Sequence, residues 1–279
     1  MTALSAVLIT LNEEHNIART IRALSFADEV LVVDSGSEDG TVEISRSLGA
    51  RVLHHPFQGY GAQKRFSVEQ AQHDWVLHLD ADEVVSPELG RSIRALLDAG
   101  EPPCAAYRIC FPTVFMGVPL AHGPISGVWK TRLFDRRRAA WTSSNVHEIV
   151  QPGGKVGTLS GTALHYTTRN ISDALRKLDH YSTLAGKELA RRGKRRSTLV
   201  MLFAMPVQFL RHYVLYRNFR NGIPGLTWSI FAALTSVMKH LKAWEVEAGI
   251  PAALQIVEPA EAPAKGAREA PPADGQALS

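Results

Sequence analysis

Apolar and polar positions in the first hundred residues predict alternating strands and helices. Helical patterns are predicted near Thr41–Leu48 and Ala62–Ala71, and an earlier helix, begun near Asn12, places Ile17, Ile21 and Leu24 on one face. Short apolar runs rich in β-branched residues precede and separate them, at Ala3–Thr10, Glu29–Val33, Ala50–His55 and Trp75–Leu79. Strands that recur roughly every 20 to 25 residues with helices between them predict βαβ units and a parallel sheet. In such a sheet ligands bind at the carboxyl ends of the strands.

The pattern changes after about residue 105, where short strand-like runs alternate with loops rich in glycine and proline, such as His122–Gly127. The predicted strands here are Ala105–Phe111, Lys130–Phe134 and Ala163–Tyr166. A long helix is then predicted over Ile171–Arg192, with Asn170 as its N-cap.

Two strongly apolar segments follow, at Leu199–Tyr216 and Ile223–Val237. Proline, glycine and polar residues interrupt both, so the uninterrupted apolar stretches are nearer ~10–14 residues than the ~20 that a membrane span needs. We therefore expect helices that lie in or on a membrane without crossing it. After Gly249 the chain is rich in proline, alanine and glutamate, which predicts a disordered tail.

The net charge of +4 conceals a strong asymmetry. Residues 1–100 hold 15 acidic and 8 basic residues, a net charge of −7, whereas residues 186–242 hold 11 basic and one acidic, a net charge of +10. The basic segment is rich in large apolar residues and contains no nucleic-acid-binding motif, which favours an anionic membrane surface over nucleic acid as its partner. Cys104 and Cys110 lack the spacing of a metal site and predict a reducing compartment.

Candidate binding residues follow the first two predicted strands. Asn12 and Glu13 come directly after the first strand, and Asp34 and Ser35 begin a turn rich in serine and glycine after the second. A carboxylate at this edge can accept hydrogen bonds from a ribose hydroxyl or a base N–H, and the glycines let a ligand approach the backbone. The same turn also carries residues that favour helix capping, so a purely structural role is equally open.

The fourth predicted strand leads into Asp80-Ala81-Asp82-Glu83. Residues two apart on an extended chain project to the same side, so Asp80 and Asp82 are expected to converge on one Mg²⁺ or Mn²⁺ that also binds a diphosphate. A nucleoside diphosphate leaving group needs such a cation, because negative charge builds on it as the glycosidic bond breaks. Lys64, in a glycine-rich turn into a helix, could contact a nucleotide phosphate, and a solvated helix start explains it almost as well.

These motifs together resemble the family 2 glycosyltransferases. The resemblance rests on Leu11-Asn12-Glu13, Asp34–Thr41, the Gly59–Arg65 turn and Asp80–Glu83, and covers roughly residues 4–100. Weaker matches extend it to about residue 245 and are similar to the β-glucosyltransferases of lipopolysaccharide core biosynthesis, at Arg132–Phe134, Val146–Glu148 and Leu164–Tyr166. The resemblance implies a GT-A fold, which is an α/β, Rossmann-like and mostly parallel sheet flanked by helices. It also implies an inverting reaction and a divalent metal.

The resemblance also implies roles by position. Asp34 would contact the uridine or ribose, Asp80 the ribose and the metal, and Asp82 the metal. Glu148 would be the base that deprotonates the acceptor hydroxyl, and chemistry supports the need for one, because a sugar hydroxyl is a poor nucleophile and in-line attack inverts the anomeric carbon. His165 would complete the metal shell or touch a phosphate, with a buried structural histidine as the alternative.

Other protein classes fit the sequence less well. Asn12-Glu13-Glu14 is neither the cationic glycine-rich loop of a sugar-phosphate nucleotidyltransferase nor the Gly-x-Gly-x-x-Gly of a dinucleotide-dependent oxidoreductase. The Gln-x-x-Arg-Trp motif of processive glycosyltransferases is absent, which disfavours polymer synthesis. Two alternatives stay open: a polyprenyl-phosphate glycosyltransferase, which needs no base, and a non-catalytic, membrane-tethered protein that binds nucleotide-sugars.

The sequence thus predicts a GT-A glycosyltransferase domain over residues 1–170, a helical, basic and apolar membrane-associating region over 171–248, and a disordered tail over 249–279. The expected reaction moves a sugar, with glucose as first choice, from a UDP-sugar to a lipid-linked glycan of lipopolysaccharide-core type. No secretory signal is recognised at the N-terminus, so the expected place is the cytoplasmic face of the inner membrane. Arg191, Arg192 and Lys194–Arg196 would hold the protein peripherally against anionic lipid, each contributing on the order of 1 kcal/mol.

Overall fold

The computed structural model describes residues 2–142, 148–193 and 198–249, and within these ranges the strands form one ten-stranded sheet and one two-stranded sheet. The strands are β1 (Leu4–Thr10), β2 (Glu29–Asp34), β3 (Arg51–His54), β4 (Trp75–Asp80), β5 (Glu83–Val85), β6 (Ala106–Phe111), β7 (Thr113–Phe115), β8 (Val118–Pro119), β9 (Val128–Asp135), β10 (Ala139–Trp141), β11 (Val150–Pro152) and β12 (Val156–Thr168). The α-helices are α1 (Glu14–Arg22), α2 (Thr41–Ser47), α3 (Tyr60–Glu69), α4 (Pro87–Asp98), α5 (Ile171–Arg191), α6 (Thr198–Leu210) and α7 (Gly222–Glu247). A π-helix, η1 (Arg211–Leu215), and a 3₁₀-helix, η2 (Asn218–Asn221), join α6 to α7.

The large sheet has the order β3-β2-β1-β4-β9-β6-β12-β7-β8, with β5 paired to β12. The first four strands are parallel, as their spacing predicts. β9 then runs antiparallel between β4 and β6. This is the mostly parallel, helix-flanked sheet expected of a GT-A fold.

Alternating side chains of the central strands supply two cores. Leu4, Ala6 and Leu8 of β1 pack with α1 and α4 on one face of the sheet. Val7 and Ile9 face the opposite way and pack with α3 and the β10–β11 hairpin. Because successive strand residues point to opposite faces, a run buried throughout is the mark of a strand covered on both sides.

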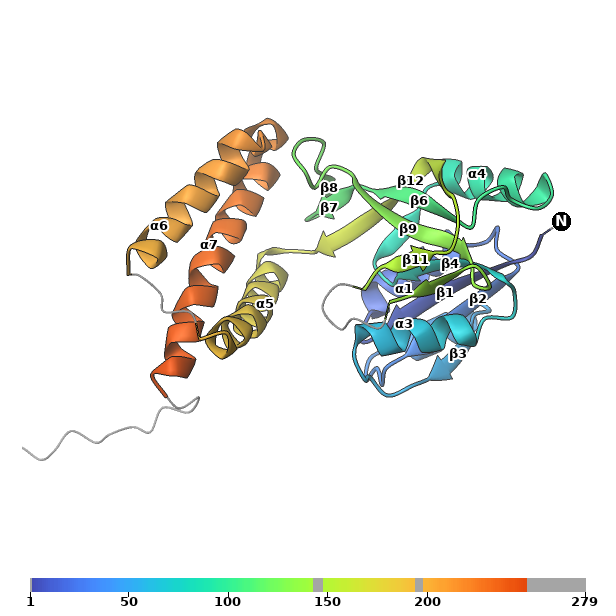
Figure 1. Cartoon of the computed structure of the whole chain (residues 1–279), viewed down its shortest axis with the longest axis horizontal. Coiled ribbons are helices and arrows are strands. Elements are labelled where there is room, and N and C mark those ends of the chain that lie inside the picture. Colours follow the sequence, from blue (N-terminus) through green and yellow to red (C-terminus); the bar gives the residue numbers. More distant parts are fainter. Residues whose placement is uncertain (1, 143–147, 194–197, 250–279) are drawn as a thin grey trace, which may run out of the picture.

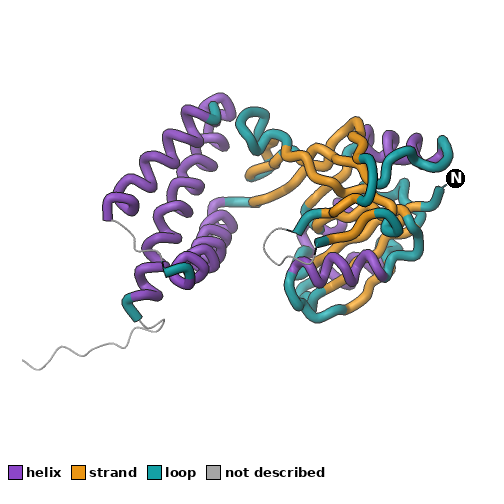
Figure 2. The backbone as a smooth tube through the Cα atoms, in the orientation of Figure 1, coloured by secondary structure: helices purple, strands orange, loops and turns teal. Residues whose placement is uncertain are grey.

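The last three α-helices form a second body beyond the end of β12 (Figures 1 and 2). The long β12 strand runs out of the sheet and continues into α5, whose N-cap Asn170 accepts a hydrogen bond from the backbone N–H of Asp173 at 2.9 Å, as predicted. α7 packs closely on α5, where Gly186 faces Ala243 and Lys242. α6 packs against α7 on the side away from the large sheet (Figure 1).

Several predicted elements differ from the observed ones. α7 extends to Glu247, well beyond the expected end at Val237. Its C-terminal part is stabilised by packing against α5, where Lys242 and Ala243 lie against Gly186, and so it needs no continuous apolar run of its own. The turn before α2 has Gly40 as the N-cap, without a side-chain cap bond, and Asp39 instead accepts a hydrogen bond from the N–H of Thr41 at 3.0 Å. The predicted tail lies outside the described residues from 250 onward.

Within the described ranges, no single helix is long and apolar enough to cross a membrane. The segments Leu199–Leu215 and Asn218–Glu247, bent by 70° at the break between them, reach that length and composition only as a pair.

Gly161 permits the contact that fixes β12 against α4. Its φ is +88°, and a Cβ at this position would lie 2.4 Å from the backbone nitrogen of Leu89. Gly49 has a similar φ of +83° but open space around it. We expect Gly161→Ala to lower the free energy of unfolding by about 1–3 kcal/mol more than Gly49→Ala, because only the former overpacks. Urea denaturation of both variants measures the difference, and equal losses would contradict the contact.

Candidate active site

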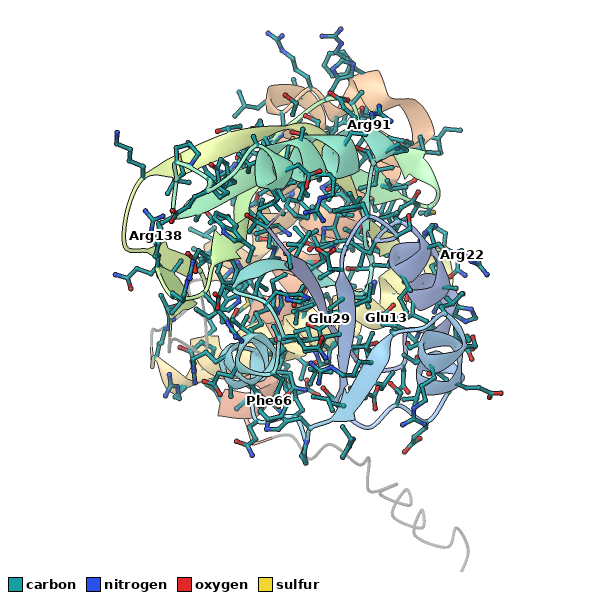
Figure 3. The ribbon with its side chains drawn as sticks, turned by 90° about the vertical axis from the view of Figure 1, so that its right-hand side faces the viewer. Glu13, Arg22, Glu29, Phe66, Arg91 and Arg138 are labelled. Carbon is teal, nitrogen blue, oxygen red and sulfur yellow. The ribbon has the colours of Figure 1, made fainter. Side chains whose placement is uncertain are left out.

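The carboxyl ends of β2, β1 and β4 meet at one edge of the sheet. Thr10 of β1 pairs in register with Asp34, the last residue of β2, and Ile9 pairs with Asp80, the last residue of β4. The residues that follow these strands therefore lie next to one another, as the sequence predicts. In Figure 3, Glu13, which follows β1, lies toward the middle of the view, whereas Arg22 and Arg138 lie at its sides.

Asp34 organises the turn after β2. One carboxylate oxygen accepts hydrogen bonds from the N–H groups of Gly36 and Ser37, both at 2.9 Å, and the other accepts one from the Ser37 hydroxyl. The side chain is almost fully buried. Asp34 therefore stabilises its own turn, which is the structural role left open above, and contact between Asp34 and a nucleoside stays a prediction.

Asn12 ties the loop after β1 to that same turn. Its backbone is left-handed, with φ of 55°, and its N–H donates to the Ser37 hydroxyl at 2.8 Å. Its side-chain oxygen accepts from the N–H of Glu38 at 2.9 Å. The neighbouring Glu13 donates its N–H to the Thr41 hydroxyl at 2.8 Å. Burial raises the pKa of the Glu13 carboxyl, an effect to which the nearby Asp82 adds.

Ser35 lies in the turn after β2, and Lys64 lies on α3. The Ser35 hydroxyl accepts a hydrogen bond at 3.0 Å from the amide of Gln63, a residue of α3 that also bonds to His55. Lys64 is 7% exposed and lies with its ammonium 4.7 Å from the centre of the Trp141 ring. Burial lowers the pKa of Lys64, and the Asp80 carboxylate opposes this shift. Lys64 is thus a buried cation beside the acidic edge, and not the solvated helix start that was the alternative.

A cluster of buried and partly buried charges surrounds the end of β4. Arg132 of β9 is 5% exposed and contacts Asp80 at 3.2 Å and Glu83 at 3.4 Å. Glu83 is fully buried and also contacts Lys130 at 2.7 Å. Burial alone would raise the pKa of Asp80, but the charges of Arg132 and Lys64 outweigh it, so the pKa lies below its ordinary value and Asp80 is ionised.

Asp80 and Asp82 do not continue one extended strand, which corrects the expectation that strand geometry aligns them. β4 ends at Asp80, and Ala81 and Asp82 form a turn before β5. Asp80 faces Arg132, whereas Asp82 contacts the imidazole Nε2 of His165 at 3.4 Å. Burial favours the neutral imidazole, but the hydrogen bond and the charge of Asp82 outweigh it and raise the pKa of His165. His165 is 28% exposed, so it is not a wholly buried structural residue.

Glu148 lies near the same site, close to the residues at the start of α3. It is partly buried, and its charge acts on both Lys64 and Tyr60. Burial, together with the charges of Asp80 and Glu148, raises the pKa of the Tyr60 phenol. The preceding Val146 and His147 of this motif lie outside the described residues.

The described residues contain no group of three or more histidine, cysteine or acidic side chains arranged to hold a metal ion. The predicted ligands Asp80, Asp82 and His165 therefore do not form a preassembled three-residue shell in this structure. The carboxylates Asp80 and Asp82 remain the oxygen donors available at the edge.

Three residues of this site, Lys130, Arg132 and Glu83, received no role from the sequence patterns, although Arg132 and Glu83 lie in the motifs that carry the resemblance. The signal was present in β9, where Lys130 and Arg132 occupy alternate positions and so point to the same face of the strand. A buried charge is rarely found without a partner, and the acidic run at residues 80–83 supplies one. The pairing could not be found without knowing that β9 lies beside β4.

The sheet and its acidic edge define the class as a GT-A glycosyltransferase, and the comparisons give the family. The sequence pattern described as glycosyl transferase family 2 matches residues 5–153. An uncharacterized glycosyltransferase of Rickettsia prowazekii is 32% identical, over 87% of each chain. The lipopolysaccharide core biosynthesis glycosyltransferase LpsC of Rhizobium meliloti is 31% identical, over 84% of this chain and 90% of LpsC. The chain belongs to glycosyl transferase family 2.

Among solved structures, glucosyl-3-phosphoglycerate synthase from Mycobacterium tuberculosis, in complex with Mn²⁺, uridine diphosphate and glucosyl-3-phosphoglycerate, is 28% identical to the aligned part. The TM-score is 0.33, and the match spans 42% of this chain and 45% of that one.

Arg132 should be essential for stability. Arg132→Met leaves Asp80 and Glu83 without their shared cation, and removing one partner of a buried charge cluster costs about 3–5 kcal/mol. The matched control is Arg191→Met, whose ion pair with Glu188 is exposed and should contribute less than about 1 kcal/mol. Urea denaturation compares the two variants, and a loss at Arg132 no larger than at Arg191 would contradict the role given to the cluster.

Proposed function

We propose that the protein transfers a sugar from a UDP-sugar, with glucose as the first donor to test, to a lipid-linked glycan of lipopolysaccharide-core type. The observation that carries the proposal is the position of Asp80 at the end of the central strand β4 and of Asp82 in the turn after it, beside Lys64 and the Asp34 turn. Similarity to LpsC over most of both chains supports the class of acceptor.

The residues at this edge suit a Mg²⁺ or Mn²⁺ ion. Mg²⁺ usually binds through one or two carboxylates together with substrate phosphates, and so needs no complete shell of protein ligands. Asp80 is ionised, and Asp82 lies 20% exposed on the same turn. These two carboxylates would hold the ion, with His165 as a further candidate. The ion would neutralise the charge that develops on the leaving diphosphate.

The other residues would bind the donor and activate the acceptor. Asp34 and Ser35, with Asn12 and Glu13, form the rim on which the nucleoside would lie. Lys64 would contact the diphosphate, since it is a buried cation close enough to Asp80 for the two charges to act on each other. Glu148 would accept the proton of the acceptor hydroxyl as that oxygen attacks the anomeric carbon from the side opposite the diphosphate, so that the configuration inverts.

Glu148→Gln tests the base. We expect the rate of transfer to fall by about 10²–10⁴-fold, the usual contribution of a general base, while UDP-sugar still binds. Glu69→Gln, an exposed glutamate at the end of α3, serves as the control and should keep full activity. The measurement is UDP release with a core oligosaccharide as acceptor. Full activity of Glu148→Gln with this acceptor would contradict the role of Glu148 as the base.

The helices beyond β12 suit attachment to a membrane surface. On α6 the apolar side chains Leu202, Phe203, Val207 and Leu210 are all more than half exposed. Exposed cations lie near both ends of this apolar helix, with Arg191 and Arg192 before it and Arg211 after it. An apolar helix flanked by cations suits the interface of an anionic bilayer, with the cations at the level of the headgroups. We propose that α6 lies in the cytoplasmic face of the inner membrane and that the association is peripheral.

Phe203→Asp tests the membrane face. Sedimentation with anionic phosphatidylglycerol vesicles should show that this change removes most of the binding, since it places a charge in the apolar layer. Phe57→Asp, at a phenylalanine of similar exposure in the catalytic half, should leave binding intact. High salt should release part of the wild-type protein because the cations contribute. Equal binding by all three proteins would contradict the role of α6.

A further inference from the structure

A cavity of about 340 Å³ lies between the end of β12 and the helices α5 and α7. Its walls come from both halves of the molecule, which meet here beside the start of α5 (Figure 1). The aromatic part of the lining consists of Phe115, Tyr181, Trp228 and Phe231, and the hydroxyl groups come from Thr167, Thr168 and Thr235. A volume of this size lies in the range of small-molecule sites, roughly 300–1,000 Å³.

The cavity is continuous with the candidate active site. Asp82 and His165, which contact each other at 3.4 Å, form part of its wall. Tyr181 lies close enough to Tyr60 of α3 that an ionised Tyr181 phenol would raise the pKa of Tyr60. A molecule in the cavity would therefore have one end beside the carboxylate proposed to hold the metal.

The lining suits a sugar better than a lipid chain. A sugar ring has C–H groups on its two faces, which stack on aromatic rings, and hydroxyl groups around its rim, which need hydrogen-bond partners. The cavity offers both: Trp228 is held edge-on by Phe115 at a ring distance of 5.4 Å, and the three threonine hydroxyls are spread over two elements. Thr167 and Thr235 donate their hydroxyls to the carbonyls of Val114 and Phe231, so they offer a sugar acceptor lone pairs, which an isoprenoid chain would leave unused.

One cation lies in the wall. The ammonium of Lys177 donates to the carbonyl oxygen of Thr167 and lies 3.5 Å from Asp173. An ammonium has three donors, so one remains for a ligand. It could bind a hydroxyl or an anionic group of the sugar.

We propose that this cavity binds the terminal sugar of the acceptor, with the reactive hydroxyl toward Asp82 and His165. The inference rests on the proposed glycosyltransfer and adds the site at which the acceptor is chosen. α5 and α7 then have a second task besides any contact with lipid, since they form the far wall of the acceptor site. Their packing is suited to that task, because Lys242 of α7 contacts Asp179 of α5 and Gly186 allows the two helices to approach closely.

Two pairs of variants test the cavity. Ala232→Phe fills it without removing a functional group, and Ala248→Phe adds the same ring at the exposed end of α7. Tyr181→Ala removes a half-exposed aromatic wall, and Leu184→Ala truncates a side chain of similar exposure that does not line the cavity. The probe is a lipid-free core oligosaccharide. Its binding is followed by calorimetry without donor and its KM by UDP release, while the affinity for UDP is measured separately.

We expect Ala232→Phe and Tyr181→Ala to raise the acceptor KM and weaken oligosaccharide binding by about tenfold or more, with the affinity for UDP unchanged and both controls like wild type. Unchanged oligosaccharide binding in both cavity variants would overturn the proposal. The proposal would also be overturned if the two cavity variants lost affinity for undecaprenyl phosphate but not for the oligosaccharide, because the cavity would then bind a lipid acceptor. Failure of the proposed glycosyltransfer would give a different result, namely wild-type protein that binds no UDP. Even then, the direct measurement of oligosaccharide binding would test the cavity.

Discussion

The structure depends on neutralising two carboxylates beside the end of β4, the fully buried Glu83 and Asp80, whose side chain is 33% exposed. Moving an ionised carboxylate out of water is costly unless a cation accompanies it. Arg132 forms an ion pair with both Asp80 and Glu83, and Lys130 forms a second ion pair with Glu83. An acidic edge that could bind a metal and a diphosphate can therefore exist in a folded protein before either ligand arrives.

That requirement explains why the parallel sheet is interrupted after β4. Arg132 and Lys130 come from β9, which runs antiparallel between β4 and β6 and brings its cations to the acidic edge. The same insertion places β6 and β12 further along the sheet, so that β12 can carry His165 to Asp82 and then lead into α5. The C-terminal helices are thus positioned by the strand that also completes the site.

Much of the first half could be predicted from sequence because its signals are local. The buried runs at β1, β2 and β4 and the polar residues after them specify the sheet edge without long-range information. Arg132 could not be assigned in this way, since its role depends on β9 pairing with β4 over more than fifty residues of chain. The turn at Ala81 and Asp82 was missed for a related reason. The backbone of Asp82 is held by a bond from the N–H of Tyr166, a partner that strand periodicity does not reveal.

The C-terminal region is harder to interpret from its composition than the first half is. Its apolar residues predict helices, but the same residues serve two surfaces. The exposed side chains of α6 face outward, while Trp228 and Phe231 of α7 line the cavity beside Asp82. Composition could not separate these roles, because they depend on which side of the helix pair each residue occupies.

The central claim is that the edge formed by β1, β2 and β4 binds a nucleoside diphosphate together with a divalent ion. Calorimetric titration with UDP, with and without Mn²⁺ or Mg²⁺, tests it directly in wild type, in Asp82→Asn and in the surface control Asp98→Asn. We predict binding that requires the metal, that Asp82→Asn weakens strongly, and that Asp98→Asn leaves unchanged. UDP binding that is independent of both the metal and Asp82, or no UDP binding at all, would contradict the account.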